Sequence, residues 1–328
     1  MAISPNISVA MCTYNGAHYI AAQLETMAAQ TLLPAEIIIS DDGSTDGTVA
    51  LLKQTWEKLV EHKTILGRIK LTVLQNKTSL GVTKNFEQAI AATSKPYIFL
   101  ADQDDLWFPQ RLETGAALLD AGAGFVFGDA DLIDGEGAPL GHTLFEALAL
   151  KNSERVGITS DPVNVLIKRN IVTGATAAFP RTVFEKAAPF PEGWVHDEWL
   201  AMVAALGGEK FAVTGPLISY RQHSSNQIGV KKNTLGTRMA KLRAEGTQRN
   251  ARLLSRMTSL AQRAPELGAD ASALKLINAA QKFQKARSAY PKNRVIRWAP
   301  VLGQVFTGRY FRVSNGPRDV LRDLVQPL

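Results

Sequence analysis

The sequence predicts an α/β fold built on a mostly parallel sheet with helices on both faces. Short apolar runs alternate with segments of helical periodicity through roughly the first hundred residues, which is the pattern of successive β-α-β units. The runs are continuously apolar, as expected for parallel strands that are covered on both faces. A strongly basic region of helical periodicity follows in the last third of the chain.

Each element follows from its own pattern. Residues 7–11 form the first apolar run and lead into the turn sequence TYNG. Ile20, Leu24 and Met27 then recur at the spacing of one helix face. The same reasoning predicts strands at 36–40, 69–74 and 97–101 and helices at 48–60 and 82–92.

Polar residues collect at the carboxyl ends of three predicted strands. These are Thr13, Tyr14 and Asn15 after the first strand, Asp41 and Asp42 after the second, and Asp102, Asp104 and Asp105 after the fourth. In an open α/β sheet, ligands bind beyond the carboxyl ends of the strands. The three segments therefore predict one shared site at this edge of the sheet.

The acidic sequence at 102–105 (DQDD) predicts a metal site. Its three carboxylates repel one another unless a cation neutralises them, and carboxylate oxygens suit Mg²⁺ or Mn²⁺. Such an ion stabilises a departing nucleoside diphosphate. The alternative is a polar turn that caps the helix expected from Pro109. Neither a G-x-G-x-x-G nor a Walker A sequence is present, so phosphates need another binding device.

The second acidic turn, at 41–47 (DDGSTDG), predicts contact with a nucleobase. A carboxylate at the strand end, Asp41 or Asp42, can accept a hydrogen bond from the imide N–H of uracil or thymine. Residues 44–47 have a simpler explanation, because such residues form turns and cap the helix that follows.

Three motifs, in this order and spacing, resemble the family 2 glycosyltransferases. They are TYNG, EIIISDDGSTDGT and FLADQDDLW, and the resemblance covers about residues 5–230. It implies the GT-A fold, a Rossmann-like sheet with flanking helices, and inverting sugar transfer from a UDP- or dTDP-linked donor. Within the family, the chain looks like the rhamnosyltransferase-type enzymes of bacterial cell-surface polysaccharide synthesis. A saccharide or lipid-linked acceptor is implied as well.

The resemblance also assigns roles on the donor side. The positions that hold the nucleoside are matched here by Thr13, Tyr14, Asn15 and Asp42, with Asp41 as their neighbour. The family's D-x-D motif maps onto residues 102–104. Asp104 is then the expected direct ligand of Mg²⁺ or Mn²⁺, with Asp102 beside it and Asp105 in an assisting position.

The catalytic base is expected at the start of a later helix. The sequence WVHDEW at 194–199 opens an apolar helical run, and the family places its base in such a segment. We assign Asp197 as the base that takes the proton of the acceptor hydroxyl, and Glu198 is the less favoured candidate. The alternative is a capping carboxylate at a helix N-terminus, which is compatible with the same role.

Another polar segment follows the apolar run 217–220. The resemblance implies that His223 approaches the metal and that Arg221 pairs with the diphosphate. A purely structural histidine is an equally good interpretation of His223. The polar loop at 222–232 is expected to close over the donor.

The resemblance also implies that residues 170–176 (NIVTGAT) form the family's central strand, which lines the acceptor pocket. Gly174 would permit close approach of the backbone there, and a bulge in the core is an equally good interpretation.

The charge distribution divides the chain into two regions. Residues 1–230 hold 17 Lys/Arg and 25 Asp/Glu, whereas residues 231–328 hold 20 and 5. We expect a glycosyltransferase domain at 1–232 and a basic helical extension at 233–328, with a break between its helices at 264–265 and a helix end at Pro291.

The basic extension predicts contact with an anionic membrane surface. Residues 294–312 mix aromatic and aliphatic side chains with arginines, which is typical of interfacial segments on anionic lipid. The simpler alternative is a solvated helical face. No helix-turn-helix, zinc, RRM or RGG pattern occurs, so we expect no nucleic-acid partner.

The remaining features concern the compartment and the competing functions. A single cysteine, Cys12, excludes a disulfide framework, and no signal peptide or long apolar stretch is evident. We expect a cytoplasmic protein at the inner face of the cell membrane.

A sugar nucleotidyltransferase is the first alternative function, but it would carry an early glycine-rich loop with a following arginine. A non-catalytic module that binds nucleotide sugar or membrane is the second.

Overall fold

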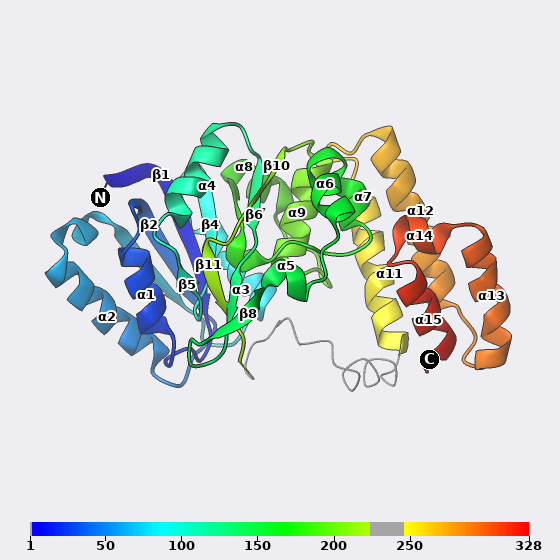
Figure 1. Cartoon of the computed structure of the whole chain (residues 1–328), viewed down its shortest axis with the longest axis horizontal. Helices are drawn as coiled ribbons and strands as arrows, with labels where there is room; N and C mark the ends of the chain where they lie inside the picture. The colour runs from blue at the N-terminus through cyan, green and yellow to red at the C-terminus, as the bar shows by residue number, and fades with distance from the viewer. Residues whose placement is uncertain (1, 224–245, 328) are drawn as a thin grey trace.

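The computed structural model describes residues 2–223 and 246–327, and its front region is built on a seven-stranded sheet (Figure 1). Its strands are β1 (Ala2–Thr13), β2 (Leu32–Asp41), β3 (Lys70–Gln75), β4 (Tyr97–Asp102), β6 (Phe125–Gly128), β9 (Ala178–Pro180) and β10 (Phe211–Thr214). They lie in the order β10-β6-β9-β4-β1-β2-β3. All neighbours are parallel except β9, which runs antiparallel to β4 and β6. The predicted, mostly parallel α/β sheet is confirmed.

Helices cover both faces of this sheet because its strands send side chains alternately into two apolar cores. On β1, Val9 and Met11 enter one core and Ala10 and Cys12 enter the other. The first core is closed by α1 (Ile20–Ala28), α2 (Thr48–His62) and α4 (Arg111–Asp120), and the second by α3 (Val82–Ala91), α8 (Arg181–Ala187) and α9 (His196–Leu206). This burial on both faces is the reason that the strands are continuously apolar.

A small second sheet lies beside the first and completes the front region. Its strands are β5 (Leu106–Trp107), β7 (Asp131–Ile133), β8 (Pro139–Thr143) and β11 (Ile218–Arg221), in the order β5-β11-β7-β8. The short elements α5 (Leu144–Ala147), α6 (Asn152–Ser160), α7 (Pro162–Leu166) and η2 (Gly174–Thr176) lie between β8 of this sheet and β9 of the first, and η1 (Thr64–Arg68) lies between α2 and β3. Because β11 pairs with β5, the polar segment after β11 lies next to the acidic segment after β4.

The strand register brings the polar strand ends together. β1 lies between β2 and β4, so that Thr13 is opposite Asp41 and Cys12 is opposite Asp102. All three strands run in the same direction, and their carboxyl ends therefore meet at one edge of the sheet.

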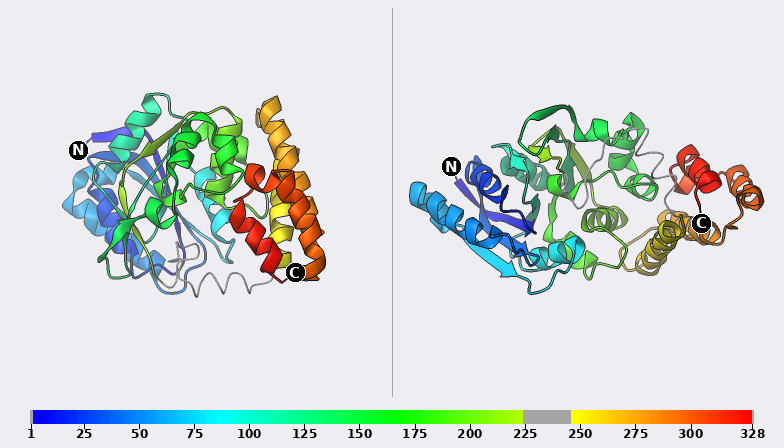
Figure 2. Two further views of the ribbon diagram at one scale, coloured as in Figure 1. Left: turned by 45° about the vertical axis from the view of Figure 1, so that its right-hand side comes forward. Right: turned by 90° about the horizontal axis from the view of Figure 1, so that it is seen from below.

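The C-terminal helices gather at the end of the molecule opposite the N-terminus, in every view of Figures 1 and 2. They are α11 (Gly246–Arg263), α12 (Ala271–Ser288), α13 (Arg294–Phe306), α14 (Arg309–Val313) and α15 (Pro317–Val325). The predicted break near residue 265 and the helix end before Pro291 agree with these bounds. Met257 and Leu260 of α11 share one apolar core with Trp199 and Leu200 of α9. The guanidinium group of Arg263 on α11 also lies 5.2 Å from the ring centroid of Trp199, so α11 contacts the helix that carries the predicted base.

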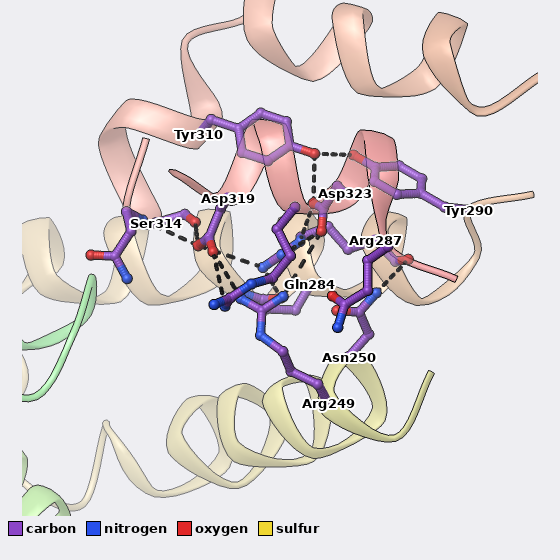
Figure 3. Close-up of polar contacts among 12 residues, drawn as sticks. Arg249, Asn250, Gln284, Arg287, Tyr290, Tyr310, Ser314, Asp319 and Asp323 are labelled. Atoms are coloured by element: carbon purple, nitrogen blue, oxygen red, sulfur yellow. Dashed lines mark hydrogen bonds and ion pairs between the residues drawn. The ribbon is translucent and has the colours of Figure 1, made fainter. Parts of the chain in front are cut away.

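A buried ionic network joins the C-terminal helices to one another (Figure 3). Arg287 on α12 donates two hydrogen bonds of 2.7 Å to the carboxylate of Asp323 on α15, which also accepts one from the hydroxyl of Tyr310. Arg249 on α11 pairs with Asp319 on α15 at 2.8 Å. Some of the basic side chains that were predicted to face solvent or a membrane therefore form ion pairs inside the protein.

One expectation is wrong, and two others fall at least partly on residues that the structure does not describe. Residues 170–176 do not form a strand: Asn170 exchanges hydrogen bonds with the backbone of Val172, and a single 3₁₀ turn follows at Gly174–Thr176. The division at 232/233 and the loop at 222–232 beyond residue 223 lie outside the described residues. Among the residues that the structure describes, no helix combines the length and the apolar character needed to cross a membrane.

Candidate active site

A cavity of about 500 Å³ opens at the carboxyl ends of β1, β2 and β4. Of the ten site residues selected from the sequence, those that line it are Thr13, Tyr14, Asn15, Asp42, Asp102, Asp104, Asp197 and His223. Asp41 and Arg221 lie outside its lining. The structure thus brings together residues that are more than two hundred positions apart in the chain.

The turn after β1 is fixed by side chains from two neighbouring loops. The side-chain oxygen of Gln103 accepts a hydrogen bond from the Tyr14 N–H at 2.8 Å, and its amide nitrogen donates to the Tyr14 carbonyl at 3.0 Å. Asn15 adopts a positive φ of 47° and accepts a hydrogen bond from the backbone of Thr45. The exposed Tyr14 ring is therefore presented on a rigid backbone at the cavity rim.

The two adjacent aspartates after β2 have different surroundings. The carboxylate of Asp41 accepts hydrogen bonds from the Thr13 hydroxyl and from both the backbone and the hydroxyl of Ser44, so it fixes the turn and does not face the cavity. Asp42 lines the cavity. Burial acts to raise the pKa of Asp42, but hydrogen bonds from Ser79 and from the backbone of residues 80–81 outweigh it and hold this pKa below its usual value.

The acidic segment after β4 crowds its carboxylates at the cavity wall. Asp104 lies 2.7 Å from Nε2 of His223, with both side chains about nine-tenths buried. Burial, and then the negative charge of Asp104, raise the pKa of Asp102 to about 7. Asp105 is buried behind them and accepts a hydrogen bond from the backbone N–H of Arg221.

Arg221 supports the acidic loop from behind. Its guanidinium group donates hydrogen bonds to the backbone carbonyls of Asp104, Asp134 and Gly135, and the side chain is almost fully buried. The guanidinium group also lies 5.0 Å from the ring centroid of Tyr19, which lines the cavity, whereas Arg221 itself is outside the lining.

The carboxylate and imidazole groups of this cavity suit a divalent cation whose other ligands come from the phosphates of a bound substrate. Within the described ranges, no three acidic, histidine or cysteine side chains converge into a complete metal site. Asp104 and His223 nevertheless bring a carboxylate oxygen and an imidazole nitrogen together at the cavity wall, with Asp102 also in the lining. Mg²⁺ is usually held by one or two carboxylates, with phosphates and waters as its other ligands.

The predicted base, Asp197, lies in the first turn of α9 and in the lining of the same cavity. Its carboxylate accepts hydrogen bonds from the backbone N–H groups of Gly174 at 3.1 Å and Glu198 at 2.6 Å. Burial, and then the negative charge of Glu198, raise the pKa of Asp197 to about 7. A carboxylate with a pKa near neutrality can both take up and release a proton under physiological conditions.

Sequence reasoning missed the neighbour of this base, His196. Its ring stacks on Phe86 with centroids 3.9 Å apart and lines the cavity, and within the part of the chain that the structure describes both of its buried ring nitrogens lack a hydrogen-bond partner. Burial lowers the pKa of His196 to about 3, so the imidazole is neutral. The ring fits only because residue 174 is a glycine: a Cβ there would lie 2.6 Å from Nε2 of His196.

Sequence reasoning also missed a contact from the C-terminal region. Nη2 of Arg256 on α11 lies 2.8 Å from Oε2 of Glu198, and its guanidinium group lies 4.3 Å from the ring centroid of Trp194. The only sequence signal was the basic periodicity of the tail, which does not identify a partner. Glu198 therefore forms an ion pair, and it is absent from the cavity lining in which Asp197 lies.

The chain matches the model of the family described as "Glycosyl transferase family 2" over residues 8–187. This match covers more than half of the chain, and the chain belongs to that family. The match includes the strands β1, β2 and β4 with their polar ends.

Three curated relatives illustrate the similarity. The chain is 36% identical over 116 residues to the putative glycosyltransferase EpsE of Bacillus subtilis (35% of this chain, 39% of EpsE). It is 31% identical over 137 residues to the putative teichuronic acid biosynthesis glycosyltransferase TuaG of the same organism (42% and 51%). It is 26% identical over 206 residues to the UDP-Glc:alpha-D-GlcNAc-diphosphoundecaprenol beta-1,3-glucosyltransferase WfgD of Escherichia coli (60% and 69%). The matches to EpsE and TuaG span 39% and 51% of those proteins, respectively.

Two solved structures share the fold. TarS 1-349 of S. aureus, in complex with UDP-GlcNAc, superposes with a TM-score of 0.57 at 14% identity, covering 96% of this chain and 82% of that one. The mannosyltransferase PcManGT from Pyrobaculum calidifontis, in complex with GDP-Man and Mn²⁺, gives 0.53 at 16% identity, covering 98% and 84%. The chain has the GT-A fold with a C-terminal helical region, as expected from its motifs.

Proposed function

We propose that this chain transfers a sugar, with inversion, from a nucleoside-diphosphate donor to a saccharide or lipid-linked acceptor in cell-surface polysaccharide synthesis. One observation carries the proposal: the pair formed by Asp104 and His223 lines the same cavity as Asp197, whose pKa is raised to about 7. A cavity of about 500 Å³ is large enough for a small organic ligand such as a nucleotide sugar. Family membership supports the same class of reaction.

On the donor side, each part of the ligand has a candidate partner. Tyr14, Asn15 and Asp42 face the nucleoside, and Thr13 contributes to the same wall while its hydroxyl holds Asp41 in place. Asp104, Asp102 and His223 would hold Mg²⁺ or Mn²⁺ next to the diphosphate. When bound, such an ion neutralises charge that develops on the departing nucleoside diphosphate. Arg221 keeps the loop of Asp104 in position.

On the acceptor side, Asp197 acts as the general base. It takes the proton of the acceptor hydroxyl while that oxygen forms a bond to the anomeric carbon. The bond between the anomeric carbon and the diphosphate oxygen breaks, and its electrons leave with the nucleoside diphosphate. Because the acceptor attacks opposite the leaving group in a single displacement, the anomeric configuration inverts.

The finer assignments rest on the relatives and on the charge distribution. The names of TuaG and WfgD state a role in teichuronic acid synthesis and a UDP-linked donor with a lipid-diphosphate acceptor, respectively. We extend a UDP- or dTDP-linked donor and a lipid-linked acceptor to this chain, with rhamnose as one candidate sugar. Residues 1–232 would form the transferase domain, and the basic helices at 233–328 would keep it at the inner face of the membrane.

The donor site is tested by thermal unfolding of the full chain with UDP, dTDP, GDP and CMP, each with and without Mn²⁺. A ligand that binds only the native state raises its stability by mass action, by about 2.7 kcal/mol at a concentration one hundred times its Kd. We expect a pyrimidine diphosphate to stabilise the protein only with Mn²⁺, and Asp104→Ala to abolish this effect. The matched control Asp131→Ala removes an exposed carboxylate on β7 and should keep it.

Transfer is tested separately from binding. With the nucleotide identified, Asp197→Asn should bind it as the wild type does and fail to release nucleoside diphosphate from the matching nucleotide sugar in the presence of acceptor. Binding with metal but no transfer by the wild type to any saccharide or lipid-linked acceptor would favour a non-catalytic binding protein. No stabilisation by any nucleotide would remove the main support for the proposal.

A further inference from the structure

One helix of the C-terminal region keeps an apolar face that the rest of the described chain does not cover. Val295, Trp298, Leu302 and Phe306 recur along α13 at intervals of three or four residues, so they lie on one side of the helix. All four are exposed, Val295 to 81% and Phe306 to 88%. We call this side the outer face of α13.

The outer face belongs to a concentration of exposed apolar side chains. Eleven large apolar side chains are exposed in the described residues, and eight of them lie between Val295 and Val325. Single exposed apolar side chains are ordinary on protein surfaces, but a contiguous group of them marks a surface that meets another molecule or a membrane.

The opposite side of α13 is fixed firmly to the protein. Arg297 is fully buried and donates hydrogen bonds to the backbone carbonyls of Pro291, Lys292, Asp323 and Gln326. The ionic network of Figure 3 holds α12 and α15 against each other beneath it. The outer face is therefore presented by a preformed helix, with little further ordering needed on contact.

The charge around the outer face of α13 indicates which kind of partner this face can bind. Residues 271–318 contain ten Lys/Arg and no Asp/Glu. The exposed cations on α13 and α14, in the loop before α13 and at the start of α15 are Lys292, Arg294, Arg309, Arg312 and Arg318. A second copy of this chain docked face to face would bring these cations against one another, which is unfavourable. An anionic surface meets both the charge and the apolar side chains.

We propose that the outer face of α13, with Phe311 on α14 beside it, inserts into the headgroup region of an anionic lipid bilayer while the flanking cations bind lipid phosphates. Interfacial helices combine apolar and aromatic side chains on one face with Lys and Arg at its borders, as α13 does. The proposal deepens the proposed function, since a transferase with a lipid-linked acceptor works at a membrane. Its physical basis is the surface itself and does not require catalysis.

Tryptophan fluorescence gives a direct test with the full chain. Trp298 is 53% exposed, whereas the other four tryptophans, Trp56, Trp107, Trp194 and Trp199, are buried. We expect a blue shift of the emission when vesicles of phosphatidylcholine mixed with phosphatidylglycerol are added, and no shift with phosphatidylcholine alone. Trp298→Phe should remove the shift while the protein still sediments with the mixed vesicles.

Surface variants separate insertion from other causes. Leu302→Ser with Phe306→Ser should lower the partition coefficient on mixed vesicles by about tenfold or more. Val156→Ser is the control, since Val156 is also an apolar side chain, 59% exposed, and lies on α6 in the front region. Arg294→Gln with Arg309→Gln should weaken binding and reduce its dependence on salt.

Three results would overturn the proposal. They are equal binding to neutral and anionic vesicles, no effect of the double serine variant, and a concentration-dependent dimer that the serine variant dissociates while no vesicle binding occurs. The vesicles carry no donor and no acceptor, so an inactive transferase would still bind them. Conversely, the serine variant should keep the metal-dependent nucleotide stabilisation, which separates a failure here from a failure of the proposed function.

Discussion

Glu198 on α9 and Arg256 on α11 form an ion pair with 2.8 Å between Oε2 and Nη2. The pair lies next to Asp197, whose pKa is raised by burial and by Glu198 and lowered by Arg256. The negative charge of Asp197 also contributes to the raised pKa of Asp102, after burial and the charge of Asp104. A helix of the C-terminal region thus places a cation beside the acidic pair that includes the proposed base.

Glu198→Gln should distinguish the two candidate bases. Asp197 must lose its proton to act, so kcat/KM should rise with pH through about 7. Removing the negative charge of Glu198 lowers the pKa of Asp197, and the rising limb should move to lower pH with the plateau kept. A loss of about a hundredfold or more at every pH would identify Glu198 as the base, and Asp197→Asn should show that loss instead.

Arg256→Gln should shift the rising limb of the kcat/KM profile to higher pH, opposite to the shift expected for Glu198→Gln. The substitution removes a positive charge that lowers the pKa of Asp197 and leaves Glu198 without its partner, so the limb should shift to higher pH. Activity lost at neutral pH should return at alkaline pH. Arg252→Gln removes an exposed cation one turn earlier on α11 and should leave the profile unchanged. An equal loss at all pH values would instead indicate structural damage.

Gly174→Ala should damage catalysis through its neighbours. The added Cβ would lie 2.6 Å from Nε2 of His196, so that ring must move, and it would touch the Cβ of Asp197 at 3.4 Å. We expect kcat to fall by about tenfold or more, because small displacements of a catalytic group are costly, while metal-dependent nucleotide stabilisation is kept. Gly215→Ala meets nothing within 4 Å and serves as the control. Equal kinetics for the two variants would contradict the role of this contact.

Asp323→Asn should destabilise the C-terminal helices. The substitution leaves the fully buried Arg287 without its bidentate carboxylate, and breaking one partner of a buried pair costs about 3–5 kcal/mol (Figure 3). Urea unfolding followed by circular dichroism measures the loss. Asp131→Asn, on an exposed site of β7, should change the free energy of unfolding by less than about 0.5 kcal/mol. A small loss for Asp323→Asn would mean that the network contributes little to stability.

Local patterns predicted the sheet and most of the site. Strands such as residues 97–101 were evident because burial on both faces demands a continuous apolar run. The cavity lining followed from strand ends, since parallel strands place Thr13, Asp42 and Asp102 at one edge whatever the details of packing. The error at 170–176 has a local cause: Asn170 bonds to its own backbone two residues on and stops a strand from forming.

The orientation of individual side chains required the tertiary structure. Adjacent residues such as Asp41 and Asp42 are equivalent in sequence, yet one holds a turn and the other faces the cavity. Arg221 bonds to backbone carbonyls that the small sheet brings to it from distant loops.

The sequence by itself determined the sheet, the acidic strand ends, the helix that carries Asp197 and the excess of basic residues in the tail. These features depend on periodicity and composition within short segments, which the chain carries locally. Only the tertiary structure decided that Arg256 reaches Glu198, that Arg287 is buried against Asp323, and that Trp298 and Phe306 remain outside. The physical reason is that a cation's partner depends on which helix packs against it, and packing joins residues far apart in the chain.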